Sequence, residues 1–281
     1  MPEVECEHCA HAFDHTDADV RHDHRLMCGD STNPEDVARL MGDDRAVLLA
    51  ADPPYLVGYD GRNRPRGPKD WRGTYREFHW DEKRPEEAEG FLLDFLKLGL
   101  AHSVENVAVY VWHASAMYSV LEAALRAAGL HVHQQIVWVK PVAVIGFCFY
   151  NYQQEPKRVH WTNEHSTVWQ VDWQGSARPE KIGPEATSHP TQKPVELFAI
   201  PMPHHTPPGD VCYEPFCGSG SQLIAAERLG RGCFAMELEP AYVDVAIRRW
   251  RNYTGRRAAH AETGEPFPEP REGDDGPEPS A

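Results

Sequence analysis

The chain has 281 residues, 41% of them hydrophobic, and a formal net charge of −15. This composition is sufficient for one large globular domain, and no apolar run approaches the ~20 residues of a membrane span. The N-terminus is polar and acidic, so the sequence predicts no signal peptide, no membrane partner and a cytoplasmic location. The seven cysteines then favour free thiols or a metal site over disulfides. Because the overall charge is negative, nucleic-acid binding would require a local basic patch.

Residues 1–23 form a polar leader that is rich in His and Cys. Cys6 and Cys9 have the Cys-x-x-Cys spacing of half a zinc site. A closed structural zinc site needs four ligands, and a second Cys-x-x-Cys is missing from the sequence. The leader is therefore either a zinc knuckle that uses Cys6 and Cys9, or a frayed segment without a metal.

A short apolar stretch, Arg25–Cys28, is followed by Gly29, Asp30 and Ser31. Pro34 then indicates the start of a helix over residues 35–41. An acidic side chain between a strand end and a helix N-terminus can bind the amino group of a ligand. It can equally cap the helix.

The six apolar residues Ala46–Ala51 predict a strand buried on both faces, which ends at Asp52-Pro53-Pro54-Tyr55 because proline cannot continue a ladder. The two prolines restrict the backbone, so the Asp52 carboxylate, the Pro53 carbonyl and the Tyr55 ring are held rigidly. Such a tip can stack a flat heterocycle and accept hydrogen bonds from its exocyclic amine. Two acceptors would localise the amine lone pair for attack on a methyl sulfonium. The alternative is a strand end followed by an ordinary turn.

A long loop over residues 56–84 follows the tip and is rich in glycine and proline. Cations interleaved with aromatic rings suit phosphates and unstacked bases, so we interpret the loop as a DNA contact, with a solvated insert as the alternative. Its basic residues are Arg62, Arg64, Arg66, Lys69, Arg72, Arg76, Lys83 and Arg84.

Helices and strands alternate after this loop. The pattern predicts a helix over 85–103, a strand over 107–112, a helix over 117–128 and a strand over 134–140, which is typical of a parallel sheet covered by helices. Residues 141–188 lose this pattern and are rich in aromatic rings, with Lys157 and Arg158 among them. This segment is predicted to be an insert, built either as an aromatic core or as a recognition surface.

A strand–turn–helix–strand pattern occupies residues 210–238, and Glu237 lies near the end of its second strand. Glycines at a strand-to-helix turn allow the backbone to approach a ligand closely, and Gly218-Ser219-Gly220 supplies such a turn. A Gly-x-Gly turn suits a nucleoside without a pyrophosphate, such as S-adenosyl-L-methionine. Glu237 comes nineteen positions after Gly218, where an acid that binds a ribose diol is expected.

With these motifs in this order, the chain resembles the β-class, or permuted, S-adenosylmethionine-dependent DNA amino-methyltransferases, which modify adenine N6 or cytosine N4. The Asp-Pro-Pro-Tyr tip comes first, residues 189–194 (His-Pro-Thr-Gln-Lys-Pro) follow, and the Phe-x-Gly-x-Gly turn lies near the C-terminus. Gly29-Asp30 resembles the Gly-Asp whose acid meets the cofactor adenine. Glu214 replaces the usual Asp, and Ser221 replaces the usual Thr. Four prolines after residue 200 shorten the helix expected there.

The resemblance implies an α/β, doubly wound, Rossmann-like fold with a mostly parallel sheet. It divides the chain into a catalytic half at 24–140, a target-recognition region at 141–188 and a cofactor-binding half at 189–257. The acidic tail at 258–281 lies outside the resemblance and is predicted to be disordered.

The resemblance also assigns roles to residues. The implied catalytic residues are Asp52, Pro53, Pro54 and Tyr55. The DNA contacts predicted from the basic, aromatic composition of the loop and of the later segment are Arg62, Arg64, Arg66, Lys69, Arg72, Arg76, Lys157 and Arg158. The implied cofactor contacts are Asp30, Ser31, Thr191, Lys193, Glu214, Phe216, Cys217, Gly218, Ser219, Gly220 and Glu237.

The expected activity is methyl transfer from S-adenosyl-L-methionine to a flipped base in DNA. An Asp at the tip favours adenine N6 over cytosine N4, and the family analogy suggests a homodimer encoded by a bacterium or phage. Two other interpretations stay open, namely glutamine methylation of a protein and a non-catalytic nucleic-acid-binding protein that retains the fold.

Overall fold

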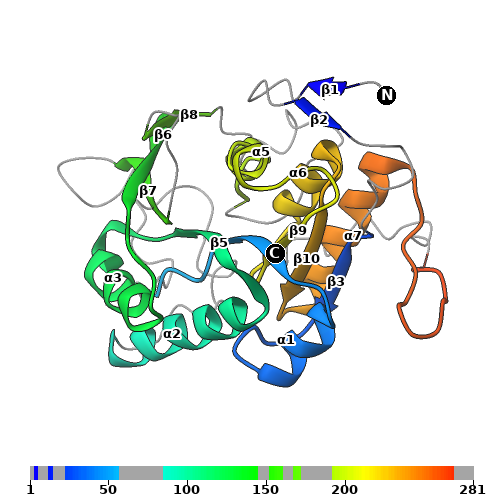
Figure 1. Cartoon of the computed structure of the whole chain (residues 1–281), viewed down its shortest axis with the longest axis horizontal. Coiled ribbons are helices and arrows are strands. Elements are labelled where there is room, and N and C mark those ends of the chain that lie inside the picture. Colours follow the sequence, from blue (N-terminus) through cyan, green and yellow to red (C-terminus); the bar gives the residue numbers. More distant parts are fainter. Residues whose placement is uncertain are drawn as a thin grey trace, which may run out of the picture.

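The computed structural model describes residues 3–5, 12–14, 23–56, 85–144, 152–160, 167–171 and 192–268. An eight-stranded sheet with the order β3-β10-β9-β4-β5-β7-β6-β8 forms its centre (Figure 1). The strands are β3 (Arg25–Cys28), β4 (Ala46–Ala51), β5 (Ser103–Trp112), β6 (Gln134–Val144), β7 (Tyr152–His160), β8 (Val168–Gln170), β9 (Val211–Glu214) and β10 (Gly232–Glu237). β7 is antiparallel to both of its neighbours, and the other pairings in this sheet are parallel. The predicted mostly parallel, Rossmann-like α/β sheet is confirmed.

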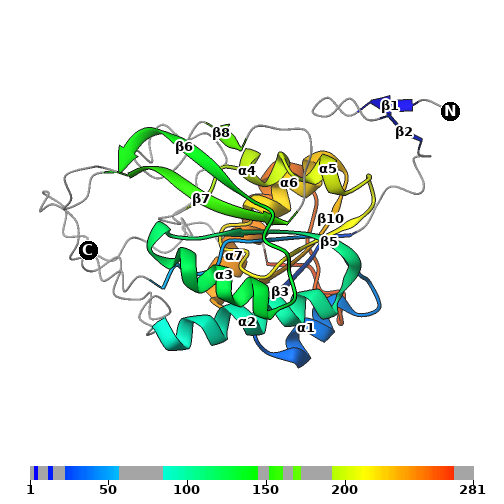
Figure 2. The ribbon, with the colours of Figure 1, turned by 60° about the vertical axis from the view of Figure 1, so that its left-hand side comes forward.

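Helices cover both faces of the sheet. They are α1 (Pro34–Met41), α2 (Pro85–Ala101), α3 (Tyr118–Ala127), α4 (Glu196–Ala199), α5 (Met202–His205), α6 (Ser221–Leu229) and α7 (Pro240–Thr254), with a short 3-10 helix η2 (Ser115–Met117). Figure 2 shows α1, α2 and α3 below the sheet and α4, α5 and α6 above it. Successive side chains of β4 alternate between these layers. Leu48 and Ala50 belong to the core with α4 and α6, whereas Leu49 and Ala51 belong to the core with α1, α2 and α3.

The direction of winding reverses between β9 and β4, which are neighbours in the middle of the sheet. From β9 the chain passes through α6 to β10, and from β4 it passes through α2 to β5 on the opposite side. In open α/β sheets, ligands bind at the carboxyl ends of the strands where the winding reverses. Asp52 directly follows β4 and Pro215 directly follows β9, so the two predicted motifs meet at this point.

The segment predicted as a separate insert contributes to the main sheet. β6 continues to Val144, β7 lies between β5 and β6, and β8 pairs with β6. The helix–strand alternation in the sequence indicates only parallel units, whereas β7 is antiparallel to both β5 and β6. The loss of the alternation therefore marks a change of strand direction within the same sheet.

The two ends of the chain also differ from expectation. In the leader, β1 (Glu3–Glu5) and β2 (Ala12–Asp14) form an antiparallel pair, while Cys6 and Cys9 lie outside the described residues. Within the described ranges, no group of three or more His, Cys, Asp or Glu could hold a metal ion. Residues 258–268, expected to be disordered, make backbone hydrogen bonds such as Phe267 N to Ala258 O (2.8 Å). Residues 269–281 are not described.

The prolines after residue 200 divide the expected helix into α4 and α5, each four residues long, so the predicted shortening is confirmed. α7 was not predicted from the sequence pattern. None of the helices in the described parts of the chain combines the length and apolar character needed to cross a membrane.

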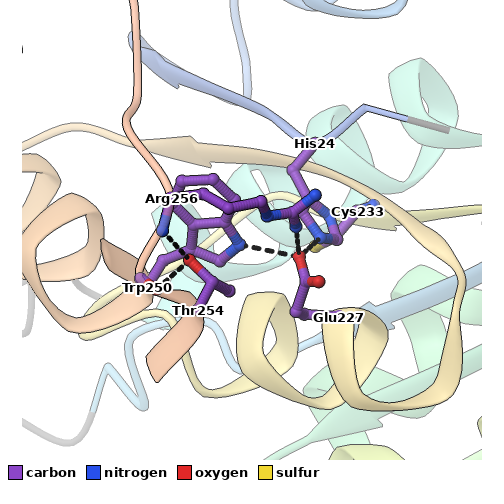
Figure 3. A network of polar contacts seen from close by, with 6 residues as sticks. All are labelled: His24, Glu227, Cys233, Trp250, Thr254 and Arg256. Atoms are coloured by element: carbon purple, nitrogen blue, oxygen red, sulfur yellow. Dashed lines mark hydrogen bonds and ion pairs between the residues drawn. The ribbon is translucent and has the colours of Figure 1, made fainter. Parts of the chain in front are cut away.

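A partly buried polar network connects the start of β3 and the end of α7 to α6 (Figure 3). The Glu227 carboxylate on α6 accepts from His24 Nε2 at 2.8 Å, from Trp250 Nε1 at 2.9 Å and from the Arg256 guanidinium. His24 Nδ1 accepts from the Cys233 amide at 3.1 Å, so the ring proton resides on Nε2. These bonds hold the pKa of Glu227 down to about 2, with the hydrogen bond from His24 as the largest cause. The network thus holds the C-terminal part of α7 and the start of β3 against the end of α6.

Candidate active site

Asp52 and Tyr55 lie at the carboxyl end of β4 and converge on one nitrogen. Lys193 Nζ donates to Asp52 Oδ1 at 2.9 Å, to Asp52 Oδ2 at 2.8 Å and to the Tyr55 hydroxyl at 2.9 Å. The Lys193 side chain is 9% exposed and that of Asp52 is 21% exposed, so this ion pair is largely shielded from water. The ammonium also lies 5.0 Å from the centre of the Tyr55 ring. The tip therefore presents a carboxylate and a phenol to a single donor group.

The backbone after the tip is strained. Leu56 has φ 54°, a left-handed conformation that costs roughly 1–2 kcal/mol in a non-glycine residue, and its side chain is buried. Such strain persists where surrounding packing enforces it, and it is common at functional sites. The packing of Leu56 adds to the two prolines in fixing the direction in which Tyr55 leaves the sheet.

A mainly apolar pocket opens between the tip, α2, the end of β5 and α3. It is lined by Pro53, Pro54, Tyr55, Leu56, Leu92, Trp112, His113, Ala114, Met117 and Leu121. The pocket gives the tip a hydrophobic wall on the side of α2 and α3.

The predicted cofactor turn lies directly after β9. Gly218 has φ 52° and Gly220 has φ 80°, conformations that favour glycine. The Gly218 amide donates to Glu237 Oε2 at 2.8 Å, and the Glu239 amide donates to Glu237 Oε1 at 3.0 Å. Burial raises the pKa of Glu237 above its usual value. Glu237 and the glycine turn are thus joined by a direct hydrogen bond, and the predicted binding of a ribose diol by Glu237 stays a prediction.

Asp30 lies beside this pair, because the Gly29 amide bonds to the Glu237 carbonyl at 3.0 Å. The Asp30 carboxylate accepts from the Thr32 amide (2.8 Å) and hydroxyl (2.7 Å), while Asn33 caps α1. Asp30 therefore closes a local turn and still lies next to Glu237, whereas the side chain of Ser31 is buried.

Glu214 lies under the turn. Its side chain is 1% exposed, and its Oε1 accepts from the Phe216 amide at 3.2 Å. With the Gln222 amide oriented to satisfy its neighbours, Gln222 also donates to Glu214 Oε2 at 2.9 Å. Burial raises the pKa of Glu214 well above its usual value, and the charges of Asp52 and Glu237 add to this effect. Glu214 thus supports the turn from within the core.

The side chains of Phe216 and Cys217 also face protein. Phe216 packs edge-on against Phe95 of α2, with ring centres 4.9 Å apart, and Cys217 is 7% exposed. These contacts leave the backbone of the turn, rather than its larger side chains, as the surface that a nucleoside could approach.

Several predicted site residues lie outside the described ranges. They are Thr191 and the loop residues Arg62, Arg64, Arg66, Lys69, Arg72 and Arg76. Lys157 and Arg158 belong to β7, where they pair in register with Trp112 and Val111 of β5. Their proposed contact with DNA stays a prediction.

Sequence reasoning missed two features of the site. His113 lines the pocket and was not singled out, although its position directly after the β5 strand could have indicated it. Lys193 was expected at the cofactor, and no pattern showed that its ammonium would reach Asp52, 141 positions earlier in the chain.

Comparisons with known proteins agree with this arrangement. The family model described as DNA methylase, for N6 and N4 methyltransferases, matches residues 148–248. The type II methyltransferase M2.DpnII of Streptococcus pneumoniae is 26% identical over 72% of this chain and 81% of its own length. M.HinfI of Haemophilus influenzae is 29% identical over 43% of this chain, and the match spans 33% of that relative.

Two solved structures share the fold of this chain. The M1.HpyAVI complex with SAM aligns with a TM-score of 0.59 at 18% identity, covering 80% of this chain and 98% of the other. The cytosine-N4-specific PvuII DNA methyltransferase aligns with a TM-score of 0.61 at 15% identity, covering 82% and 86%. The sequence matches thus support an N6/N4 DNA amino-methyltransferase, and the solved structures show that the fold is shared.

Proposed function

We propose that this protein transfers a methyl group from S-adenosyl-L-methionine to the exocyclic amine of a base flipped out of DNA, with adenine N6 as the preferred acceptor. The observation that carries the proposal is the convergence of Asp52 and Tyr55 on one nitrogen, at the edge of the sheet where the glycine turn lies. An exocyclic amine offers the same kind of N–H donors as the lysine ammonium now bound there.

The residues around the turn fit the proposed cofactor. Each Glu237 oxygen accepts one backbone amide, and a carboxylate has further lone pairs that could accept from a ribose diol. Asp30 lies beside Glu237, in a place suited to an adenine amino group. The carboxyl groups of Asp52 and Glu237 lie close enough to Glu214 to add to the rise in its pKa.

Asp52 and Tyr55 would act by orienting the target amine. When bound, S-adenosyl-L-methionine would supply a methyl group on a sulfonium: as the amine nitrogen bonds to the methyl carbon, the carbon–sulfur electron pair would stay on sulfur. The amine proton released would pass to the Asp52 carboxylate and from there to water. The Asp52 carboxylate, and the Pro53 carbonyl predicted beside it, would be the acceptors for the positive charge that develops on nitrogen. Lys193 balances the carboxylate charge until the amine arrives, and it must then share or yield these acceptors.

Binding of DNA by an acidic protein requires a localised positive surface. The basic loop at 62–76, with Lys157 and Arg158, is proposed to supply it, and the enzyme would act on a bacterial or phage genome in the cytoplasm. A homodimer is proposed by family analogy alone.

The proposal is tested by nucleoside analysis of methylated DNA. The protein is incubated with isotopically labelled S-adenosyl-L-methionine and mixed-sequence duplex DNA, and the digested nucleosides are separated by mass spectrometry. We expect labelled N6-methyladenine with the unmodified protein and a loss of at least about 100-fold with Asp52→Asn, because an amide presents one acceptor fewer. Asp94→Asn, an exposed change on α2, is the matched control and should retain activity.

The alternatives give different products in the same experiment. Label in N4-methylcytosine would assign the other base of the family, and label in protein would indicate glutamine methylation. DNA binding without any cofactor binding, measured by calorimetry, would leave a non-catalytic DNA-binding protein and would contradict the proposed enzyme.

A further inference from the structure

We infer that Ser221 and Arg249 are positioning residues. They fix the position of Lys193, and through it the positions of Asp52 and Tyr55, relative to the glycine turn. The inference rests on the proposed function, since it concerns how the cofactor turn and the methyl-accepting site are kept together. Arg249 lies beyond the residues matched by the family model, and Ser221 and Arg249 are both absent from the catalytic and cofactor residues implied by the sequence.

Arg249 of α7 is buried directly behind the turn, with 4% of its surface exposed. Its Nη1 donates to the Ser219 carbonyl at 3.1 Å, to the Ser219 hydroxyl at 3.3 Å and to the Ser221 hydroxyl at 3.0 Å. One guanidinium nitrogen therefore joins the middle of the turn to the first residue of α6.

Ser221 carries the connection onward. Its hydroxyl donates to the Lys193 carbonyl at 2.6 Å, and the Lys193 ammonium bonds to Asp52 and Tyr55. A guanidinium can only donate, so the Ser221 oxygen accepts from Arg249 and its proton is left for the Lys193 carbonyl. Arg249 thereby sets the direction of the Ser221 hydroxyl.

The packing of α7 makes this connection rigid. A Cβ added to Gly220 would lie 3.1 Å from Ala246 Cβ, and Ala246 is three residues before Arg249 on the same helix. The helix therefore contacts the turn through two residues on the same face, Ala246 and Arg249. A shift of α7 would move the turn and the lysine backbone together, which is how two sites on separate strands stay aligned.

The test compares steady-state methyl transfer by Ser221 variants. Ser221→Ala removes the link to Lys193 but leaves the turn, so we expect kcat to fall about tenfold while the KM for the cofactor and the thermal midpoint stay near those of the unmodified protein. Ser221→Thr keeps the hydroxyl and should restore kcat. Ser103→Ala is the matched control, because it also removes a hydroxyl bonded to a backbone carbonyl (2.7 Å) but lies at the opposite end of the sheet.

A double-mutant cycle separates positioning from general stabilisation. In a Lys193→Met background, Ser221→Ala should cause no further loss of kcat, because the hydroxyl acts through Lys193. Additive losses, or a kcat for Ser221→Ala within twofold of the unmodified protein, would overturn the inference. An unmodified protein that binds cofactor and DNA but transfers no methyl group contradicts the proposed function instead, and the two failures are thus distinguished.

Discussion

At the scale of single residues, the site consists of predictable positions joined by an unpredictable contact. The Asp-Pro-Pro-Tyr tip could be located because prolines after an apolar run leave few backbone conformations, and Gly218 and Gly220 because their positive φ values favour glycine. The ion pair between Lys193 and Asp52 could not be located, because no local pattern encodes a contact across 141 residues. Glu214 differs in the opposite way. Its place in the motif suggested a contact with the cofactor, but its side chain is buried beneath the turn.

The Lys193 ammonium is expected to be important for turnover and unimportant for holding DNA. Lys193→Met removes three hydrogen bonds at the tip and leaves Asp52 without this cation, so we expect kcat to fall by about 10-fold to 100-fold. The dissociation constant for DNA should change by less than about threefold, since the ammonium faces the tip. Lys97→Met, an exposed change on α2, is the control, and equal kcat values for the two variants would contradict this role.

At the scale of elements, the position of α2 under the tip depends on one glycine. A Cβ on Gly99 would lie 2.5 Å from Leu49 Cδ1 and 3.3 Å from the Tyr213 ring, so a methyl group there must displace the buried Leu49 side chain or move α2 away from β4 and β9. We expect Gly99→Ala to lower the free energy of unfolding by about 1–3 kcal/mol.

The same helix offers an internal control. A Cβ on Gly90 meets nothing within 4 Å, so Gly90→Ala should stabilise the protein by about 0.5–1 kcal/mol through helix propensity. Urea unfolding of both variants measures the difference. Similar effects of the two changes would show that α2 does not pack as closely on β4 as described.

The Glu227 network predicts a pH-dependent contribution to stability. The pKa of Glu227 is lowered from 4.5 to about 2, so its ionised form stabilises the fold above 4.5 and this contribution is lost as pH falls toward 2. Near neutral pH, Glu227→Gln should lower the free energy of unfolding by about 1–2 kcal/mol, a value reduced from the full shift because Glu227 and Arg256 are partly exposed.

The free energies of unfolding of the unmodified protein and of Glu227→Gln should become more similar as the pH is lowered from 4.5 toward 2. Urea unfolding at a series of pH values measures this difference. Glu122→Gln, which removes one partner of the exposed pair with Arg126, is the control and should have little effect at any pH. A difference for Glu227→Gln that stays constant down to pH 3 would argue against the lowered pKa.

At the scale of the whole molecule, the sequence predicted the layers of the fold better than the connection of its strands. Alternating helices and strands indicate a parallel sheet locally, and that part is confirmed. The placement of β7 between β5 and β6, and of β3 at the far edge beside β10, depends on pairing between distant segments. The order of the motifs, with the tip before the cofactor turn, still brings both to the centre, because β4 and β9 are neighbours there.

The most direct test of the account is a crystal structure of the protein with S-adenosyl-L-homocysteine bound. We predict that the ribose lies on Glu237 and that the sulfur lies over the turn from Phe216 to Gly220. The sulfur should face Asp52, which follows the neighbouring strand β4. The same ligand bound elsewhere on the protein, or bound at the turn with its sulfur directed away from Asp52, would contradict the assignment of this edge of the sheet as the methyl-transfer site.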